Sequence, residues 1–201
     1  VRPQRSKRLP RTLTHQELGK LIQVCQQSEN PLAEVIVVVL LETGLRVSEL
    51  CGLDCIDVDY HDLSANVWSG KGDKDRRVLF TKRSKDILEK WLRHRSSKAG
   101  KNEKALFLNG RGHRLTQRNV QKMMDFLADD AGILRSRLTP HTLRHNFATG
   151  LLERGADIVS IQRLLGHADI SSTRVYLDIT DQTLREVYRR AQEADLFGDI
   201  E

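Results

Sequence analysis

The chain has 201 residues, of which 39% are hydrophobic, and carries a formal net charge of +6 at neutral pH. This length and apolar content suffice for a packed core and exclude wholesale disorder, while the basic excess favours a polyanionic partner such as nucleic acid. The longest apolar run, residues 35–41, is too short to span a bilayer, and no signal region opens the sequence, so we expect a soluble, cytoplasmic protein.

Cysteines give no sign of a disulfide framework. There are three of them, Cys25, Cys51 and Cys55, an odd number at irregular spacing. We interpret them as reduced thiols, mostly in the core.

The first dozen residues are predicted to form an extended basic arm. Residues 1–12 hold two prolines, few apolar side chains and several arginines and lysines, which is typical of a linker. We therefore assign residues 1–12 to an interdomain linker and residues 13–201 to one folded domain.

Two helices are predicted next. Thr14 and Glu17 have capping-box spacing, and apolar residues follow at helical period as far as Cys25. Pro31 suits the first turn of a second helix and Gly44 suits its end. The valine-rich run between them could also be a strand, but its length and these bracketing residues favour a buried helix.

The middle of the chain changes to strand-like patterns. After a short turn at residues 47–50, we expect short strands at 56–58, 63–68 and 77–80, with a hydrophilic hairpin loop between the last two. A helix follows at about residues 83–95.

The C-terminal third is predicted to be helical. Helices at about 117–131, 140–155 and 157–166 each end at a glycine, and a short helix carrying Tyr176 and a last helix at about 182–194 follow. The predicted fold class is α+β, mainly α-helical with a small antiparallel three-stranded sheet.

The helix that begins at Pro140 carries candidate phosphate ligands. At about 100° per residue, His141, Arg144 and His145 share one face near the helix start, where the helix dipole also favours an anion. The two histidines could instead bind zinc, but a zincin needs Glu where Thr142 stands. Ordinary surface polarity is the other alternative for this helix alone.

Three further segments hold candidate residues. Arg46 directly follows a helix stop, and Glu49 could fix its guanidinium or a neighbouring backbone amide. Lys71 lies between two glycines that let a hairpin tip approach a ligand, although the spacing is not that of a P-loop. His167 follows a helix-ending glycine, and Tyr176 lies in a polar helix. Each alone would be taken for a surface or packing residue.

Taken together, these segments resemble the catalytic domain of the tyrosine recombinases, the phage-integrase and Xer-like family, over about residues 10–195. TGLRVSEL fits the first arginine box, GKGDKDRRV the lysine hairpin, HTLRH the His-x-x-Arg box and LLGH the second histidine box. Tyr176 fits the nucleophile position. Leu177 departs from the family, because many Xer-like members have Thr-His there.

The resemblance implies a charge clamp on the scissile phosphate. Arg46 and Arg144 would hold its non-bridging oxygens, since a guanidinium bonds two oxygens at once and stays charged. Glu49 and His145 would be supporting residues. These arginines take the place of a metal, so the resemblance implies no metal and no cofactor.

The resemblance also assigns the proton transfers and the covalent step. Lys71 would protonate the departing 5′ oxygen, and His141 would act as general base or hydrogen-bond partner for the tyrosine. His167 would bind a phosphate oxygen, and Tyr176 would form a 3′-phosphotyrosyl bond.

Double-stranded DNA is the implied partner, bound by a homotetramer or heterotetramer on paired sites, with a monomer in the absence of DNA. The implied location is the nucleoid. Residues 182–198 are a candidate contact to a neighbouring subunit. The resemblance also implies an N-terminal core-binding domain, which is absent from this chain. Basic residues of the arm and the hairpin are the expected DNA contacts: Arg5, Lys7, Arg8, Arg11, Lys74 and Arg76.

The expected reaction is site-specific recombination, in DNA integration, excision, chromosome-dimer resolution or movement of a mobile element. Alternatives within the same chemistry are a type IB topoisomerase and a telomere-resolving strand transferase. A DNA-binding regulator that does not cut is another, although it has no need for all six catalytic residues. An RNA-binding or structural module explains only the charge.

Overall fold

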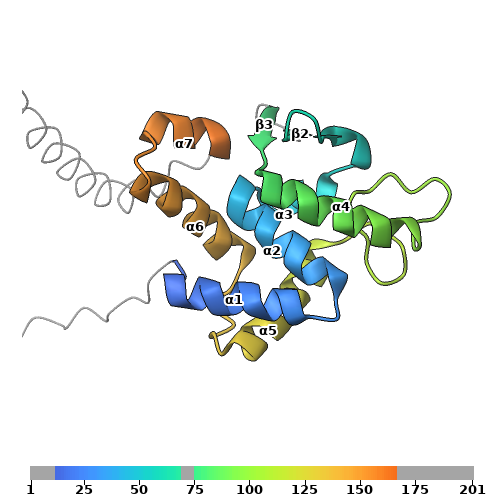
Figure 1. Ribbon diagram of the computed structural model, residues 1–201, viewed down its shortest axis with the longest axis horizontal. Coiled ribbons are helices and arrows are strands. Elements are labelled where there is room, and N and C mark those ends of the chain that lie inside the picture. The colour runs from blue at the N-terminus through green and yellow to red at the C-terminus, as the bar shows by residue number, and fades with distance from the viewer. Residues whose placement is uncertain (1–11, 69–74, 167–201) are drawn as a thin grey trace, which may run out of the picture.

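The computed structural model describes residues 12–68 and 75–166 as a set of helices with one small sheet at the edge of the molecule (Figure 1). In chain order the elements are α1 (His15–Gln27), α2 (Pro31–Thr43), α3 (Val47–Gly52), the 3₁₀ turn η1 (Cys55–Asp57), β1 (Val58–Asp59), β2 (Ser64–Val67), β3 (Arg76–Leu79), α4 (Lys82–Ser96), α5 (Gln117–Ala131), α6 (Pro140–Glu153) and α7 (Ile158–Leu165). The predicted fold class is confirmed. None of the described helices combines the length and the apolarity that crossing a membrane demands.

Helix ends follow the capping residues of the sequence. Thr14 Oγ1 accepts from the Glu17 backbone amide at 3.2 Å, and the Glu17 carboxylate accepts from the Thr14 amide at 2.8 Å, which completes the predicted capping box. Gly44 and Gly132 end α2 and α5 in the left-handed conformation, with φ of 64° and 67°. These boundaries are confirmed.

Helix α2 is the centre of the fold. Nine of its 13 residues are buried, and it packs against α1, α4 and α6 (Figure 1). A helix surrounded by others must be apolar on every side, which explains the valine-rich run. The buried helix that the sequence favours over a strand is therefore confirmed.

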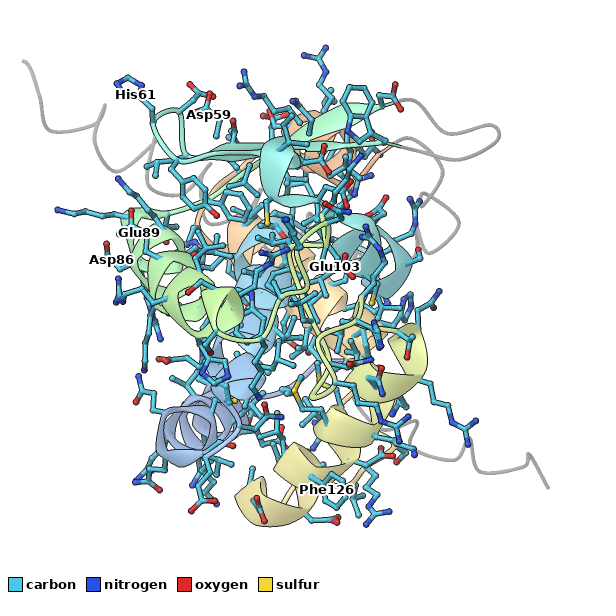
Figure 2. The ribbon with its side chains drawn as sticks, turned by 90° about the vertical axis from the view of Figure 1, so that its right-hand side faces the viewer. Asp59, His61, Asp86, Glu89, Glu103 and Phe126 are labelled. Carbon is cyan, nitrogen blue, oxygen red and sulfur yellow. The ribbon has the colours of Figure 1, made fainter. Side chains whose placement is uncertain are left out.

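The sheet is antiparallel in the order β1-β2-β3, as predicted. Ala65 pairs with Val58 on one side and Val78 on the other, and all three side chains are buried toward the helices. The β1–β2 turn with Asp59 and His61 lies at one end of the molecule, and α5 with the exposed Phe126 lies at the other (Figure 2).

Two short segments differ from the sequence prediction. Residues 47–50, expected as a turn, belong to helix α3, because Glu49 accepts the Arg46 backbone amide at 2.7 Å and so caps a helical turn. The expected strand at 56–58 is largely η1, because the Asp57 carboxylate accepts from the Asp54 amide at 2.8 Å and bends the chain.

Apolar side chains form two clusters. The larger one fills the space between α1, α2, α4, α5 and the sheet, and the smaller one joins α6 to α7 through Phe147, Ile161 and Leu165. The three cysteines are free, and burial raises the pKa of Cys25 to about 12 and that of Cys51 to about 11. These two thiols are therefore packing residues, as expected.

Candidate active site

A pocket of about 240 Å³ opens where the start of α3 meets the start of α6. Its lining comes from two segments about a hundred residues apart in the chain: Arg46, Val47, Ser48, Pro140, His141 and Arg144. Thr139 caps α6 by accepting from the Thr142 amide at 3.1 Å, so the positive end of this 14-residue helix faces the pocket. Two guanidiniums and a helix N-terminus together favour an anion.

Arg144 is a buried arginine, 5% exposed, in the first turns of α6. Its Nη1 donates to the Gly44 carbonyl, and its Nη2 donates to the Leu165 carbonyl at 2.7 Å. Each carbonyl lies at the C-terminal end of a helix, where backbone oxygens lack a helical partner and carry partial negative charge. The guanidinium is therefore held in one orientation between the ends of α2 and α7, beside the pocket.

Gly44 allows α6 to pack closely against the end of α2. It adopts φ of 64°, and a Cβ added there would overlap the Phe147 ring of α6. Only glycine lets α6 lie this close to the end of α2. The close packing brings Arg144 within reach of the Gly44 carbonyl.

Arg46 reaches the same pocket from the N-cap of α3, with its side chain 26% exposed. Glu49 accepts from the Arg46 backbone amide at 2.7 Å and from Arg46 Nη1 at 3.0 Å. The sequence suggested that Glu49 fixes either the Arg46 guanidinium or a backbone amide, and in the structure it binds both. One carboxylate orients both the helix start and the arginine.

His141 and His145 form an imidazole pair one turn apart on α6. Their Nε2 atoms lie 3.0 Å apart, and the rings meet edge to face at a centroid distance of 4.4 Å. A hydrogen bond between these two nitrogens needs one donor and one acceptor, so one proton lies between the two Nε2 atoms. His141 is exposed at the pocket and His145 is 8% exposed behind it, which suits a proton acceptor with a buried partner.

Arg76 differs from its predicted role as a DNA contact. Its side chain is 8% exposed, and its guanidinium binds both Glu49 oxygens, at 2.5 and 2.8 Å, and the Leu164 carbonyl at 3.0 Å. The sequence held a signal for this. Side chains alternate along a strand, so Arg76 faces the same side as the buried Val78, and Arg77, whose side chain is 52% exposed, faces solvent.

The remaining predicted site residues lie outside the described part of the chain. They are Lys71, Lys74, His167 and Tyr176, together with Arg5, Lys7, Arg8 and Arg11. Two described features border them. The last turn of α7, directly before residue 167, is held by Arg144 and Arg76 through its carbonyls.

The second feature is the point where the basic arm meets the fold, at residues 12–13. Arg137 Nη2 donates to the Thr12 carbonyl at 3.0 Å, and Asn146 of α6 bonds both backbone groups of Leu13, at 2.8 and 2.9 Å. Neither contact was predicted, since no local sequence pattern connects residues more than a hundred positions apart.

No group of three or more histidine, cysteine or acidic side chains within residues 12–68 and 75–166 has the arrangement to hold a metal ion. The histidine pair therefore has no third ligand among the described residues. The prediction that the chemistry runs without a metal stays a prediction.

Comparison with known sequences gives one consistent result. The model of the phage integrase family matches residues 11–183. Tyrosine recombinase XerC of Corynebacterium efficiens is 40% identical over 194 residues, which is 95% of this chain and 61% of that protein. Tyrosine recombinase XerD of Oceanobacillus iheyensis is 41% identical over 93% of this chain and 64% of that protein. The chain thus spans somewhat over three fifths of these relatives.

Solved structures agree in fold. The crystal structure of XerA recombinase superposes with a TM-score of 0.78 at 38% identity, over 92% of this chain and 66% of that one. XerH site-specific recombinase, bound to palindromic difH substrate in a post-cleavage complex, gives a TM-score of 0.73 at 29% identity, over 90% and 53%.

Proposed function

Because the chain belongs to the phage integrase family of tyrosine recombinases, we propose that it is the catalytic part of a site-specific DNA recombinase. In this proposal it cleaves and rejoins double-stranded DNA through a 3′-phosphotyrosyl bond to Tyr176. The observation that carries the proposal is the meeting of Arg46 and Arg144 at one pocket beside the start of α6. A phosphodiester is the anion that two fixed guanidiniums and two adjacent imidazoles suit best.

The charge clamp acts mainly in the transition state. As the tyrosine oxygen bonds to phosphorus, the phosphoryl oxygens gain negative charge, which Arg46 and Arg144 stabilise. Arg144 needs no reorganisation to do so, since the Gly44 and Leu165 carbonyls already fix its plane. A donor that is already held in this orientation stabilises the transition state more than it stabilises the bound substrate.

Proton transfers complete the step. The phenolic proton of Tyr176 passes to His141, whose Nε2 lies 3.0 Å from Nε2 of His145. The bond from phosphorus to the 5′ oxygen breaks, and Lys71 supplies the proton to that oxygen. His167 binds a phosphoryl oxygen. The phosphotyrosyl bond keeps the energy of the broken ester, so the reverse attack rejoins the strand without ATP.

We further propose that the protein acts as a tetramer on paired sites at the nucleoid, in integration, excision or resolution. The basic arm supplies DNA contacts at Arg5, Lys7, Arg8 and Arg11, and Lys74 of the hairpin adds another. The contacts between Leu13 and Asn146 support this, because they fix the chain that follows the arm to the same helix that carries Arg144.

The test uses the full 201-residue chain and a pool of nicked duplexes with randomised sequence, from which cleavage releases a short fragment and traps the protein on DNA. We expect a covalent adduct with the unaltered chain and none with Tyr176→Phe. Tyr60→Phe is the matched control, because the Tyr60 hydroxyl is buried and has no hydrogen-bond partner among the residues that the structure describes. Absence of any adduct, or an undiminished adduct in Tyr176→Phe, would contradict the proposal.

A further inference from the structure

Arg76 lies at a junction of three elements. It is on β3, its guanidinium binds Glu49 of α3, and its Nε donates to the Leu164 carbonyl at the end of α7 at 3.0 Å. β3, α3 and the end of α7 come from parts of the chain that are not adjacent in sequence. A single side chain therefore joins the three elements behind the pocket.

The Glu49 carboxylate accepts four hydrogen bonds from two arginines. Its Oε1 accepts from Nη1 of Arg46 at 3.0 Å and from Nη1 of Arg76 at 2.5 Å. Its Oε2 accepts from the Arg46 amide at 2.7 Å and from Nη2 of Arg76 at 2.8 Å. A carboxylate has about four acceptor positions, so these four bonds fix its plane completely.

The carboxylate of Glu49 is shared between two guanidiniums, those of Arg46 and Arg76. The side chains of Glu49 and Arg76 are only 9% and 8% exposed. Without Arg76, the negative charge of Glu49 would face Arg46 without the second guanidinium that now offsets it. Little water is present to screen this effect, because the pair is buried.

We propose that Arg76 is a positioning residue of the charge clamp: it offsets the negative charge of Glu49 and fixes the plane of its carboxylate, which in turn orients Arg46 toward the scissile phosphate. This inference rests on the proposed function. Arg76 also donates to the carbonyl next to the one that Arg144 holds, so the two arginines fix the last turn of α7 together.

The matched pair of variants is Arg76→Gln and Arg77→Gln. Both change one arginine of β3, but the Arg77 side chain is 52% exposed and pairs with Asp62 at the surface. Each variant is assayed as the full chain on a nicked duplex recovered from the randomised pool. We expect Arg76→Gln to slow adduct formation by about tenfold or more relative to Arg77→Gln, with DNA affinity within about twofold.

Two readouts separate a charge effect from general damage to the fold. In the first, a methyl group replaces one non-bridging oxygen of the scissile phosphate, which removes the negative charge that Arg46 serves. The deficit of Arg76→Gln should shrink on this substrate. In the second, Glu49→Gln is added to Arg76→Gln, which removes the negative charge that Arg76 no longer offsets and should raise the rate above that of Arg76→Gln.

Arg76→Lys keeps the positive charge but loses the planar guanidinium that donates two parallel hydrogen bonds, so this variant should retain more activity than Arg76→Gln. It also remains informative if the glutamine variant does not fold. Equal rates for Arg76→Gln and Arg77→Gln would overturn the inference and leave the proposed function intact. A deficit that is the same on both substrates and is not relieved by Glu49→Gln would also overturn it. Lack of an adduct with the unaltered chain would overturn the proposed function itself.

Discussion

The two arginines of the pocket owe their positions to acceptors that the fold holds in place. Arg144 is held by the carbonyls of Gly44 and Leu165, and Arg46 is held by the carboxylate of Glu49. Long, flexible side chains thereby act as fixed donors. The entropy of ordering them is lost during folding and not when DNA binds.

Glu49→Gln tests this arrangement through stability. Burial alone raises the pKa of the Glu49 carboxyl, but hydrogen bonds from Arg76 and the Arg46 amide, with both positive charges, lower it below 4.5 overall. A lowered folded-state pKa means that the interaction stabilises the fold fully above the unfolded pKa and is lost as pH falls through the folded one. We expect the substitution to reduce the free energy of unfolding by about 3 kcal/mol at neutral pH.

Urea unfolding at neutral pH and in the acid range below 4.5 measures this effect, and the penalty of Glu49→Gln should shrink in acid. Glu89→Gln is the control, because Glu89 pairs with Lys85 at the surface, and its substitution should change stability by less than about 1 kcal/mol. A penalty that does not vary with pH would contradict the ion-pair account of Glu49.

Residue roles were predictable from sequence where a local pattern or the family resemblance carried them. Glu49 lies three positions after Arg46, a spacing that a helical turn closes, so their interaction could be foreseen. Arg76 was assigned to DNA because it lies in a basic hairpin. Its contacts with Glu49 and Leu164 span 27 and 88 positions, which no local pattern encodes.

At the scale of elements, the pocket depends on how α6 packs against the end of α2. Gly44 has φ of 64° and lies against the Phe147 ring, so α6 can approach the C-terminal carbonyls of α2. The approach also lets Arg144 reach the Gly44 carbonyl. Gly44, which ends α2, therefore determines how closely α6 and its Arg144 approach α2.

Gly44→Ala should be markedly more harmful than Gly132→Ala. Both glycines are left-handed helix ends, with φ of 64° and 67°, but a Cβ at Gly132 meets nothing within 4 Å. The backbone strain costs about 1–2 kcal/mol at either site. Overlap with Phe147 adds about 1–3 kcal/mol at Gly44 alone.

Chemical denaturation of the two alanine variants gives the comparison, and adduct formation should fall only in Gly44→Ala. Equal losses of stability would mean that the packing of Phe147 on Gly44 has no energetic importance.

Helix boundaries were the most predictable elements, because their signals are local. Thr14, Pro31, Gly44 and Gly132 mark ends that the structure places as the sequence suggested. The short elements were missed. Both α3 and η1 begin where an acidic side chain three positions ahead accepts a backbone amide, and such a signal is too brief to separate from a turn.

At the scale of the whole molecule, folding brings together segments that the sequence keeps apart. The pocket joins residues 46–48 to 140–144, and the guanidiniums of β3 and α6 meet the end of α7. In Figure 1, α7 lies near β3, in line with the contacts between them. The resemblance named the boxes in order, but only the fold shows that two of them share one pocket.

Attachment of the chain to DNA through Tyr176 can be tested by mapping the covalent bond. The adduct is digested with nuclease and trypsin, and mass spectrometry locates the remaining nucleotide. Tyr176 lies in the tryptic peptide of residues 175–185, VYLDITDQTLR. We expect a nucleotide linked through its 3′-phosphate to Tyr176. A nucleotide on any other residue, or one linked through a 5′-phosphate, would contradict it.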